Sequence, residues 1–414
     1  MPRGIACCDF AVTTDIAAQT HASGFLMARK PVPCVGSPTF DPIARVQDAD
    51  ARAKVLSLLA NDDLAAAIKA YFQLPANDTW TYHAITAVTL PQVQHIVGLG
   101  GQNGLHAWYS SPDGGDPQTP LDPPPRTDID DYIRIFQPSS LTSSALKALG
   151  ANAKKGSIRS GVAAHLTSNR FIHPGAGHLN IPKKKPAAKD VPPNIYLDFW
   201  EWSCRKLEWC GPGPESEARP QQSHHVLPIF MHHFGCAVPS YESLEILRLV
   251  AAGRTVVDVG SGNGYWTFML RLHGLADIVP VDNAQSDWRA SWVSDTVIMD
   301  GTKWLAQPRN AGGADMVLLM VYPVVGGGLA GGVEGGFTRG LMKAFKGDTV
   351  AVVGTQNRNG YTSFSNITFD QYMAQEQPTW TKLVQIPLPS FAGKDEALYV
   401  YQRGERAAKL SATT

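Results

Sequence analysis

The sequence has few of the features that mark secreted, metal-binding or membrane proteins. Its six cysteines form no C-x-x-C pair, and their spacing fits neither a dense disulfide framework nor a zinc knuckle. No apolar run approaches the roughly 20 residues that a membrane-spanning helix needs. Asp9 and Asp15 interrupt the N-terminal stretch in which a signal peptide would lie. We therefore expect a cytoplasmic or nuclear protein that has no membrane partner.

An excess of charge of one sign is also lacking. Lys and Arg together number 36, and so do Asp and Glu together. A chain with this balance has no long-range field that would gather nucleic acid. We interpret its one basic stretch, 154–185, as a solvated linker, with a nuclear-import or phosphate-binding tract as the alternative. The expected partner is therefore a small molecule or a protein and not nucleic acid, and the oligomeric state is left open.

Proline and glycine divide the chain into three parts. Residues 1–190 are helical and loop-rich, with an irregular start, a helical pair over 49–72 and a proline-rich loop over 112–125. Residues 191–250 form a helical linker or lid, in which the aromatic residues between Ile195 and Trp209 predict a buried amphipathic helix. Residues 251–405 form a third unit with a regular pattern of its own.

In this third unit, short apolar runs alternate with segments of helix length. The runs predict strands at 255–259, 278–281, 295–299, 316–321, 349–353, 383–387 and 397–401. Such alternation is typical of βαβ units around a parallel sheet that helices cover on both faces. A short segment joins the last two runs, which predicts a closing antiparallel pair. The predicted fold class is α/β: a doubly wound, mostly parallel sheet of seven strands behind a mainly helical or irregular N-terminal extension.

Three glycines stand at the turn between the first of these strands and the next helix. Gly260, Gly262 and Gly264 follow Asp258, and glycine at such a turn lets the backbone approach a ligand closely. A dinucleotide fingerprint would need a glycine where Tyr265 stands, and no Lys-Ser or Lys-Thr follows as in a phosphate-binding P-loop. The carboxylate of Asp258 suits a ligand with a positively charged amino group.

The segment from Val256 to Trp266 resembles motif I of the class I S-adenosylmethionine-dependent methyltransferases, a family with a Rossmann-like sheet. The likeness begins near Leu227, and the arrangement also resembles a fungal group of methyltransferase-like proteins. The resemblance implies S-adenosyl-L-methionine as the cofactor. Asp282 stands where the family has the carboxylate that holds the ribose hydroxyls, and Asp300 stands where the adenine amine is contacted.

The glycine loop, these two carboxylates and their neighbours make up the expected cofactor site. Trp288 is included because it follows the ribose carboxylate closely. The expected cofactor-binding residues are Asp258, Gly260, Ser261, Gly262, Asn263, Gly264, Tyr265, Asp282, Asn283, Trp288, Asp300 and Gly301.

The methyl acceptor is marked less clearly. Tyr322 and Pro323 stand in the place of the family's motif IV but depart from its Asn-Pro-Pro-Tyr form, so the acceptor atom stays open. Tyr322 and His233 are the candidate bases. The segment 232–234 is either a lid over the substrate or ordinary packing of a helix, and the glycine-rich segment 326–336 is either a gate or an insertion.

These observations predict methyl transfer to the oxygen or nitrogen of a small molecule or a protein side chain, by in-line displacement. The alternative is a non-catalytic methyltransferase-like protein that senses the cofactor or serves as a scaffold. The histidine pairs at 224–225 and 232–233 have no carboxylate at ligand-like spacing, so we expect no metal.

Overall fold

A computed structural model gives the fold of the chain. It describes residues 36–37, 39–84, 86–100, 108–109, 121–181, 186–187, 190–214, 223–323 and 333–407. Several predictions therefore lie wholly or in large part outside the described residues. They are the irregular start, the proline-rich loop, the lysines at 183–185 of the basic stretch and most of the glycine-rich segment.

Helices dominate the first part of the chain. The predicted helical pair is confirmed as α2 and α3, which pack against each other. The side chain of Asp48 accepts from the backbone N of Ala51, and that of Asp63 from the backbone N of Ala66, so both helices begin with a capped first turn. The elements are α1 (Pro42–Gln47), α2 (Ala49–Ala60), α3 (Leu64–Phe72), β1 (Thr81–His83), β2 (Ala87–Thr89) and α4 (Leu90–Leu99).

A second group of helices leads from this part to the large sheet. Helix α8 confirms the predicted buried amphipathic helix, because Tyr196, Phe199 and Trp200 are fully buried on it. The elements are α5 (Arg126–Arg134), α6 (Thr142–Ala151), α7 (Ile158–Ser168), β3 (Phe171–Ile172), a 3-10 turn (Pro174–Leu179) and α8 (Ile195–Lys206).

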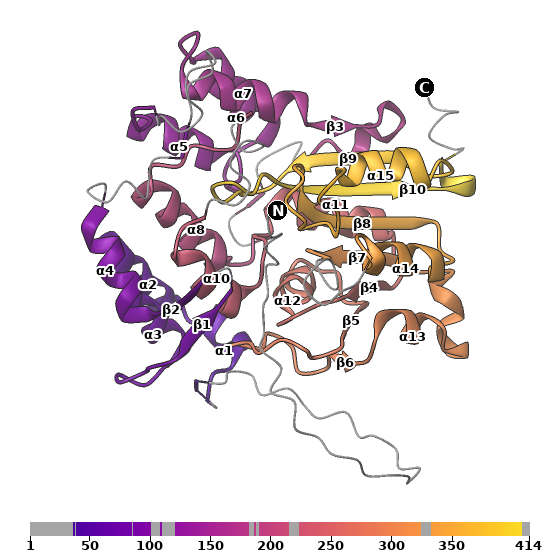
Figure 1. Ribbon diagram of the computed structural model, residues 1–414, viewed down its shortest axis with the longest axis horizontal. Helices are drawn as coiled ribbons and strands as arrows, with labels where there is room; N and C mark the ends of the chain where they lie inside the picture. The colour runs from indigo at the N-terminus through magenta and orange to yellow at the C-terminus, as the bar shows by residue number, and fades with distance from the viewer. Residues whose placement is uncertain are drawn as a thin grey trace.

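The rest of the chain is an α/β unit in which all seven predicted strands are present (Figure 1). Helices α10 (Val226–Phe234) and α11 (Tyr241–Ala251) precede the first of these strands. The strands are β4 (Val256–Val259), β5 (Ile278–Asp282), β6 (Val297–Ile298), β7 (Val317–Val321), β8 (Thr349–Thr355), β9 (Thr381–Pro387) and β10 (Glu396–Gln402). The remaining elements are α12 (Tyr265–Leu272), α13 (Gly301–Leu305), a 3-10 turn (Pro308–Gly313), α14 (Gly336–Ala344) and α15 (Phe369–Glu376).

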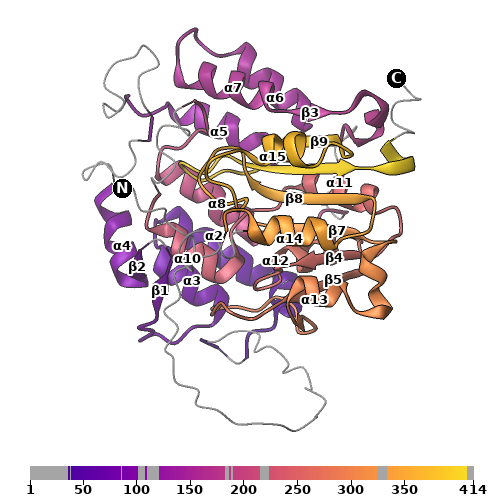
Figure 2. The ribbon, with the colours of Figure 1, turned by 45° about the vertical axis from the view of Figure 1, so that its right-hand side comes forward.

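In the part of the chain that the structure describes, the sheet has eight strands in the order β3-β9-β10-β8-β7-β4-β5-β6 (Figure 2). Strands β4 to β8 pair in parallel, whereas β10 is antiparallel to both β8 and β9, as the predicted closing pair requires. The expected count of seven is corrected by β3, a two-residue strand of the N-terminal region that pairs with the edge of β9. The strand order reverses at β4, because β5 and β6 follow on one side of it whereas β7 and β8 follow on the other. Ligands of open α/β sheets bind at the carboxyl ends of the strands around such a point.

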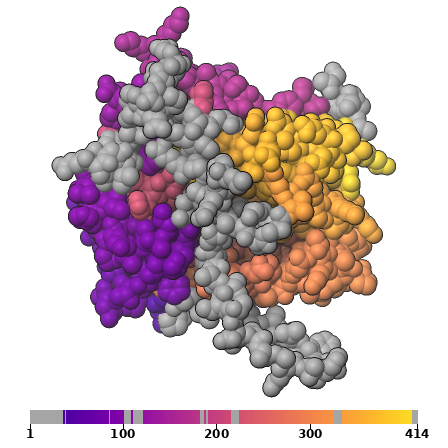
Figure 3. All heavy atoms as spheres, in the orientation of Figure 1, coloured from indigo at the N-terminus to yellow at the C-terminus, as the bar shows by residue number. Residues whose placement is uncertain are grey.

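Helices cover both faces of the sheet. On one face Val256 and Leu319 belong to a hydrophobic cluster with α8, α10, α11 and α12, and on the other face Val257 and Leu318 pack with α13, α14 and α15. The first cluster also contains core residues of α2 and α3. The N-terminal helices, indigo to violet in Figure 3, therefore share a core with the sheet region drawn in orange and yellow.

Helix α10 decides between the two interpretations of segment 232–234. Every residue of α10 is buried, so the segment packs as part of the core and is not a lid. None of the helices in the described part of the chain has the length and apolar character that crossing a membrane would require.

Candidate cofactor and acceptor site

The glycine loop after β4 lies at the carboxyl edge of the sheet, where the strand order reverses. Gly260, Gly262 and Gly264 have φ angles of +77°, +56° and +79°, which are unfavourable for residues with a side chain. A Cβ on Gly262 would lie 3.0 Å from Cζ2 of Trp288, and one on Gly264 would collide with Val293. The loop therefore has a shape that requires glycine, and the Trp288 ring lies directly against it.

Three polar atoms at the end of β4 and in this loop are buried and have no hydrogen-bond partner among the described residues. They are Oδ1 of Asp258, Oγ of Ser261 and Nδ2 of Asn263. The other carboxylate oxygen of Asp258 accepts from Oγ1 of Thr267 at 2.7 Å. Burial raises the pKa of Asp258 to about 7, and the nearby carboxylate of Asp282 adds to the rise. An unpaired buried polar atom costs free energy, so three such atoms at the end of β4 and in its loop fit a polar ligand.

Asp282 ends β5 beside this loop. Its Oδ2 accepts from the backbone N of Gly262 at 2.9 Å, and its Oδ1 from the backbone N of Ala284 at 2.7 Å. Burial raises the pKa of Asp282. A carboxylate has about four acceptor positions, so both oxygens retain capacity for the two hydroxyls of a ribose. Asn283 is exposed, and its Oδ1 accepts from the backbone N of Gln285.

Asp300 and Gly301 form the start of α13. Oδ1 of Asp300 accepts from Oγ1 of Thr302 at 2.5 Å and from the backbone N of Lys303 at 3.0 Å. The hydrogen bond from Thr302 is the main reason that the pKa of Asp300 lies below its ordinary value. A Cβ on Gly301 would collide with Val259, so this glycine lets α13 approach β4 closely. Both residues thus have a structural role that is independent of any ligand.

Tyr265 is a correction to the expected cofactor set. Its side chain is buried, and its hydroxyl group donates to Oδ1 of Asn194 at 2.8 Å. The same hydroxyl oxygen accepts from the backbone N of Tyr196 at 3.2 Å. The Tyr265 side chain therefore joins α12 to α8 and does not line the glycine loop.

His233 is a correction to the expected bases. The ring is fully buried, lies 4.0 Å from the Phe72 ring between centroids, and its Nε2 is 3.0 Å from the hydroxyl oxygen of Tyr82. Burial holds the pKa of His233 well below its ordinary value. His233 is therefore a neutral core residue between α10 and the N-terminal region.

Tyr322 lies where the strand order reverses, directly after β7. It has a φ of +50° although it is not glycine, and its backbone N donates to the carbonyl O of Val353 at 2.7 Å. Its hydroxyl group donates to Oε1 of Glu396 at 2.8 Å, and its ring lies 5.2 Å from that of Tyr361 between centroids. Among the expected bases, Tyr322 is thus the one that the structure places at the carboxyl edge.

Sequence reasoning missed Glu396. This residue is fully buried at the first position of β10, and burial raises its pKa to about 8. One signal was present, because Glu396 directly precedes the predicted strand 397–401, and a charged residue is unusual in a buried strand. Its position beside Tyr322 depends on the pairing of β10 with β8, which no local pattern indicates.

Comparison with known proteins gives partial structural likenesses. No protein-family model matches the chain, and no curated protein matches it. The chain is similar to a proposed S-adenosylmethionine-dependent methyltransferase from Streptococcus mutans, with 16% identity, 37% of this chain and 45% of that chain covered, and a TM-score of 0.28. A methyltransferase of the same cofactor from Agrobacterium tumefaciens shows 12% identity over 38% of this chain and 60% of that chain, with a TM-score of 0.27. A proposed RNA methyltransferase from Pyrococcus horikoshii shows 10% identity over 42% of this chain and 88% of that chain, also with a TM-score of 0.27.

These structural neighbours are methyltransferases, two of them proposed ones. The matched region spans less than half of the Streptococcus mutans protein. The α/β fold of this chain follows from its own strand order and strand directions.

Proposed function

We propose that the protein is an S-adenosylmethionine-dependent methyltransferase that acts on the oxygen or nitrogen of a small molecule or a protein side chain. The observation that carries the proposal is the set of unpartnered buried atoms of Asp258, at the end of β4, and of Ser261 and Asn263 in the glycine loop that follows. The loop lies at the carboxyl edge where the strand order reverses, which is the general ligand position of such sheets. Asp282 adds a carboxylate at the end of the neighbouring strand.

The residues of the loop would each meet one part of the cofactor. The carboxylate of Asp258 suits the ammonium group, the amide of Asn263 suits the carboxylate, and Asp282 suits the ribose hydroxyls. The half-buried ring of Trp288 offers a flat apolar surface beside the loop. When bound, S-adenosylmethionine supplies an electrophilic methyl carbon on a sulfonium. The protein then has to hold the acceptor in line with that carbon and exclude water.

The test is calorimetric titration of the purified chain with S-adenosylmethionine and with S-adenosylhomocysteine. We expect micromolar affinity, and we expect Asp282→Ala to weaken binding by at least tenfold, since about 1.4 kcal/mol is the scale of one hydrogen bond to a charged group. Asp277→Ala is the matched control, because Asp277 lies just before the same strand at its opposite end and is exposed. Equal weakening by both variants, or no binding by the unmodified chain, would refute the assignment.

A second measurement separates catalysis from binding. Labelled S-adenosylmethionine is incubated with the protein and a cell extract, and the label is followed into small molecules and proteins. Transfer that is lost in Asp282→Ala supports the enzyme. Binding without any transfer would instead favour the non-catalytic sensor or scaffold.

A further inference from the structure

Strand β7 separates two groups of side chains at the carboxyl edge of the sheet. On one side it neighbours β4, which leads into the glycine loop, and on the other side lie β8 and then β10. The hydrogen bond from Tyr322 to Glu396 therefore extends past the end of β8 to the first residue of β10. Tyr322 thus follows the strand next to the one that leads into the glycine loop, and Glu396 lies two strands further along the same edge, on the side away from that loop.

The backbone at Tyr322 favours a role in aiming its side chain. A φ of +50° is uncommon for an aromatic residue, and such conformations persist where surrounding contacts enforce them. Here the enforcing contact is the 2.7 Å hydrogen bond from the Tyr322 backbone N to Val353 of β8. The chain turns sharply at the end of β7, and the phenol is directed along the edge of the sheet toward Glu396.

The carboxylate of Glu396 is held in a fully buried position. Oε1 accepts from the hydroxyl group of Tyr322 at 2.8 Å, and Oε2 accepts from the backbone N of Phe391 at 3.1 Å. Buried carboxylates are rare unless partners compensate for their charge. Burial raises the pKa of Glu396, while the hydrogen bonds from Tyr322 and Ser390 and the charge of Lys394 oppose the rise.

The other ionisable groups around Glu396 come from three further elements. The buried ammonium group of Lys394 donates to the hydroxyl oxygen of Tyr361, after β8, at 2.9 Å. Tyr132 of α5 interacts electrostatically with both Asp395 and Glu396, and burial raises its pKa well above the ordinary value. The site therefore combines one buried cation, two buried carboxylates and three phenols.

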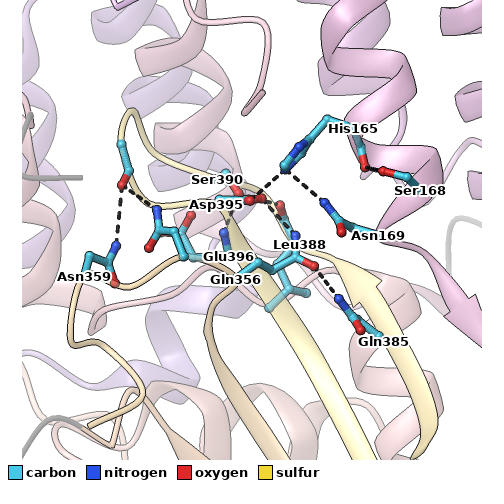
Figure 4. Close-up of polar contacts among 12 residues, drawn as sticks. His165, Ser168, Asn169, Gln356, Asn359, Gln385, Leu388, Ser390, Asp395 and Glu396 are labelled. Atoms are coloured by element: carbon cyan, nitrogen blue, oxygen red, sulfur yellow. Dashed lines mark hydrogen bonds and ion pairs between the residues drawn. The ribbon is translucent and has the colours of Figure 1, made fainter. Parts of the chain in front are cut away.

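Contacts from the N-terminal region hold the residue that precedes Glu396 (Figure 4). The buried carboxylate of Asp395 lies 2.7 Å from Nε2 of His165, which belongs to α7, and accepts from Nε2 of Gln356 at 2.9 Å. Gln385 in turn donates to Oε1 of Gln356 at 2.7 Å. Helix α7 thereby holds the residue that immediately precedes Glu396 and β10.

Resting on the function proposed above, we propose that Tyr322 and Glu396 take up the proton of a hydroxyl group that accepts the methyl group. The acceptor oxygen forms a bond to the methyl carbon while the bond from that carbon to sulfur breaks, and the electron pair of the broken bond stays on sulfur. The acceptor proton passes to the phenol oxygen of Tyr322, as the phenol proton passes to the carboxylate of Glu396. The positive charge on sulfur and the negative charge on Glu396 disappear together, so the step balances.

The chemistry of the pair favours a hydroxyl compound over an amine as the acceptor. A hydroxyl group becomes strongly nucleophilic only as its proton leaves, whereas a neutral amine already has the lone pair that it needs. Tyr322 is the catalytic residue in this step, and Glu396 acts through it. His165 and Asp395 are positioning residues for Glu396.

The pH dependence of binding tests this proposal without knowledge of the acceptor. Dissociation constants of S-adenosylmethionine and S-adenosylhomocysteine are measured from pH 6 to pH 9. Only the first ligand has a sulfonium, so the ratio of the two affinities removes effects of groups that contact the shared amino acid and adenosine parts. Glu396 ionises around pH 8, and the sulfonium favours its ionised form. If the sulfonium lowers the pKa of Glu396 by about one unit, linkage makes the ratio rise about tenfold over this pH range.

Two variants and a control complete the binding test. Glu396→Gln should give a ratio that does not change with pH, and Tyr322→Phe should shift the rise to higher pH because the ionised carboxylate loses one donor. Glu376→Gln, an exposed residue paired with Arg339, should behave as the unmodified chain does. A flat ratio in the unmodified chain, or an unchanged rise in Glu396→Gln, would overturn the proposal. If neither ligand binds, the failure lies in the proposed function itself.

Probe acceptors test the hydroxyl preference. Catechol and 1,2-diaminobenzene are incubated separately with the protein and labelled S-adenosylmethionine at pH 8.5. Label in catechol that Glu396→Gln reduces at least tenfold, with both proteins saturated with S-adenosylmethionine, supports the proposal. The proposal is contradicted if the diamine is labelled at a rate that Glu396→Gln leaves unchanged. It is also contradicted if neither probe is labelled and the affinity ratio does not change with pH.

Discussion

The buried carboxyl group of Asp258 should make the protein less stable as the pH rises, and Asp258→Asn should remove that effect. The pKa of this group is about 7 in the folded chain and 3.8 in its ordinary state. Between these two values the folded state retains a proton that the unfolded state releases. The contribution of this group to the stability of the folded state is therefore complete below pH 4 and is lost progressively as the pH rises to about 7.

The size of the effect follows from the pKa difference. Folding raises the pKa of Asp258 by about three units, which corresponds to a total change of about 4 kcal/mol in the free energy of unfolding. About 2.5 kcal/mol of this change occurs between pH 5 and pH 8. Asparagine has nearly the same shape, and its side-chain oxygen can still accept from Thr267. The burial of its amide has a cost that does not change with pH. The free energy of unfolding of the variant relative to the unmodified chain should thus increase by about 2.5 kcal/mol from pH 5 to pH 8.

Urea denaturation followed by far-UV circular dichroism at both pH values measures this difference. S-adenosylmethionine binding at pH 8 provides the functional counterpart, and Asp258→Asn should weaken it at least tenfold. A stability difference that is the same at pH 5 and pH 8 would refute the reasoning, because the carboxyl group would then have its ordinary pKa. Tighter cofactor binding by the variant would refute the role assigned to Asp258.

Two further predictions concern stability. Gly264→Ala should be destabilised by at least 2 kcal/mol more than Gly274→Ala. Both positions have a positive φ, which costs a residue with a side chain about 1–2 kcal/mol. Only the new methyl group at position 264 would also collide with a neighbour, Val293. Urea midpoints measure both, and equal losses would contradict the collision. His165→Ala should cost about 2 kcal/mol, because the buried carboxylate of Asp395 loses one hydrogen bond, and a loss below about 0.5 kcal/mol in the same assay would contradict this.

The part of the fold that the sequence predicts is the part that local patterns determine. Each parallel strand is a short apolar run because helices bury both of its faces, so the runs stand out between the amphipathic helices. The glycine loop is also local, since a positive φ at Gly260, Gly262 and Gly264 depends on the turn itself. Asp282 could be assigned because it ends the strand that follows this loop.

The errors concern residues whose surroundings come from distant parts of the chain. His233 is close to the sheet in sequence, yet its ring contacts Phe72 and Tyr82, which precede it by more than 100 residues. Tyr265 follows the glycine loop directly, but the direction of its side chain is set by Asn194 of the linker before α8. Strand β3 has two residues and becomes a strand only by pairing with β9. In each case the partner decides the role, and a single sequence does not identify the partner.

The same distinction explains why the sequence marks a methyl donor site and leaves the acceptor open. The donor side consists of β4, its glycine loop and the end of β5, which lie within 27 residues of one another in the chain, from Val256 to Asp282. The acceptor side consists of Tyr322 after β7, Glu396 on the antiparallel β10 and, behind them, His165 of α7. These residues meet only after the sheet has closed and the N-terminal region has packed against its edge. Variation in the N-terminal region should therefore change acceptor choice through the turn at Asp395 while the affinity for S-adenosylmethionine is preserved.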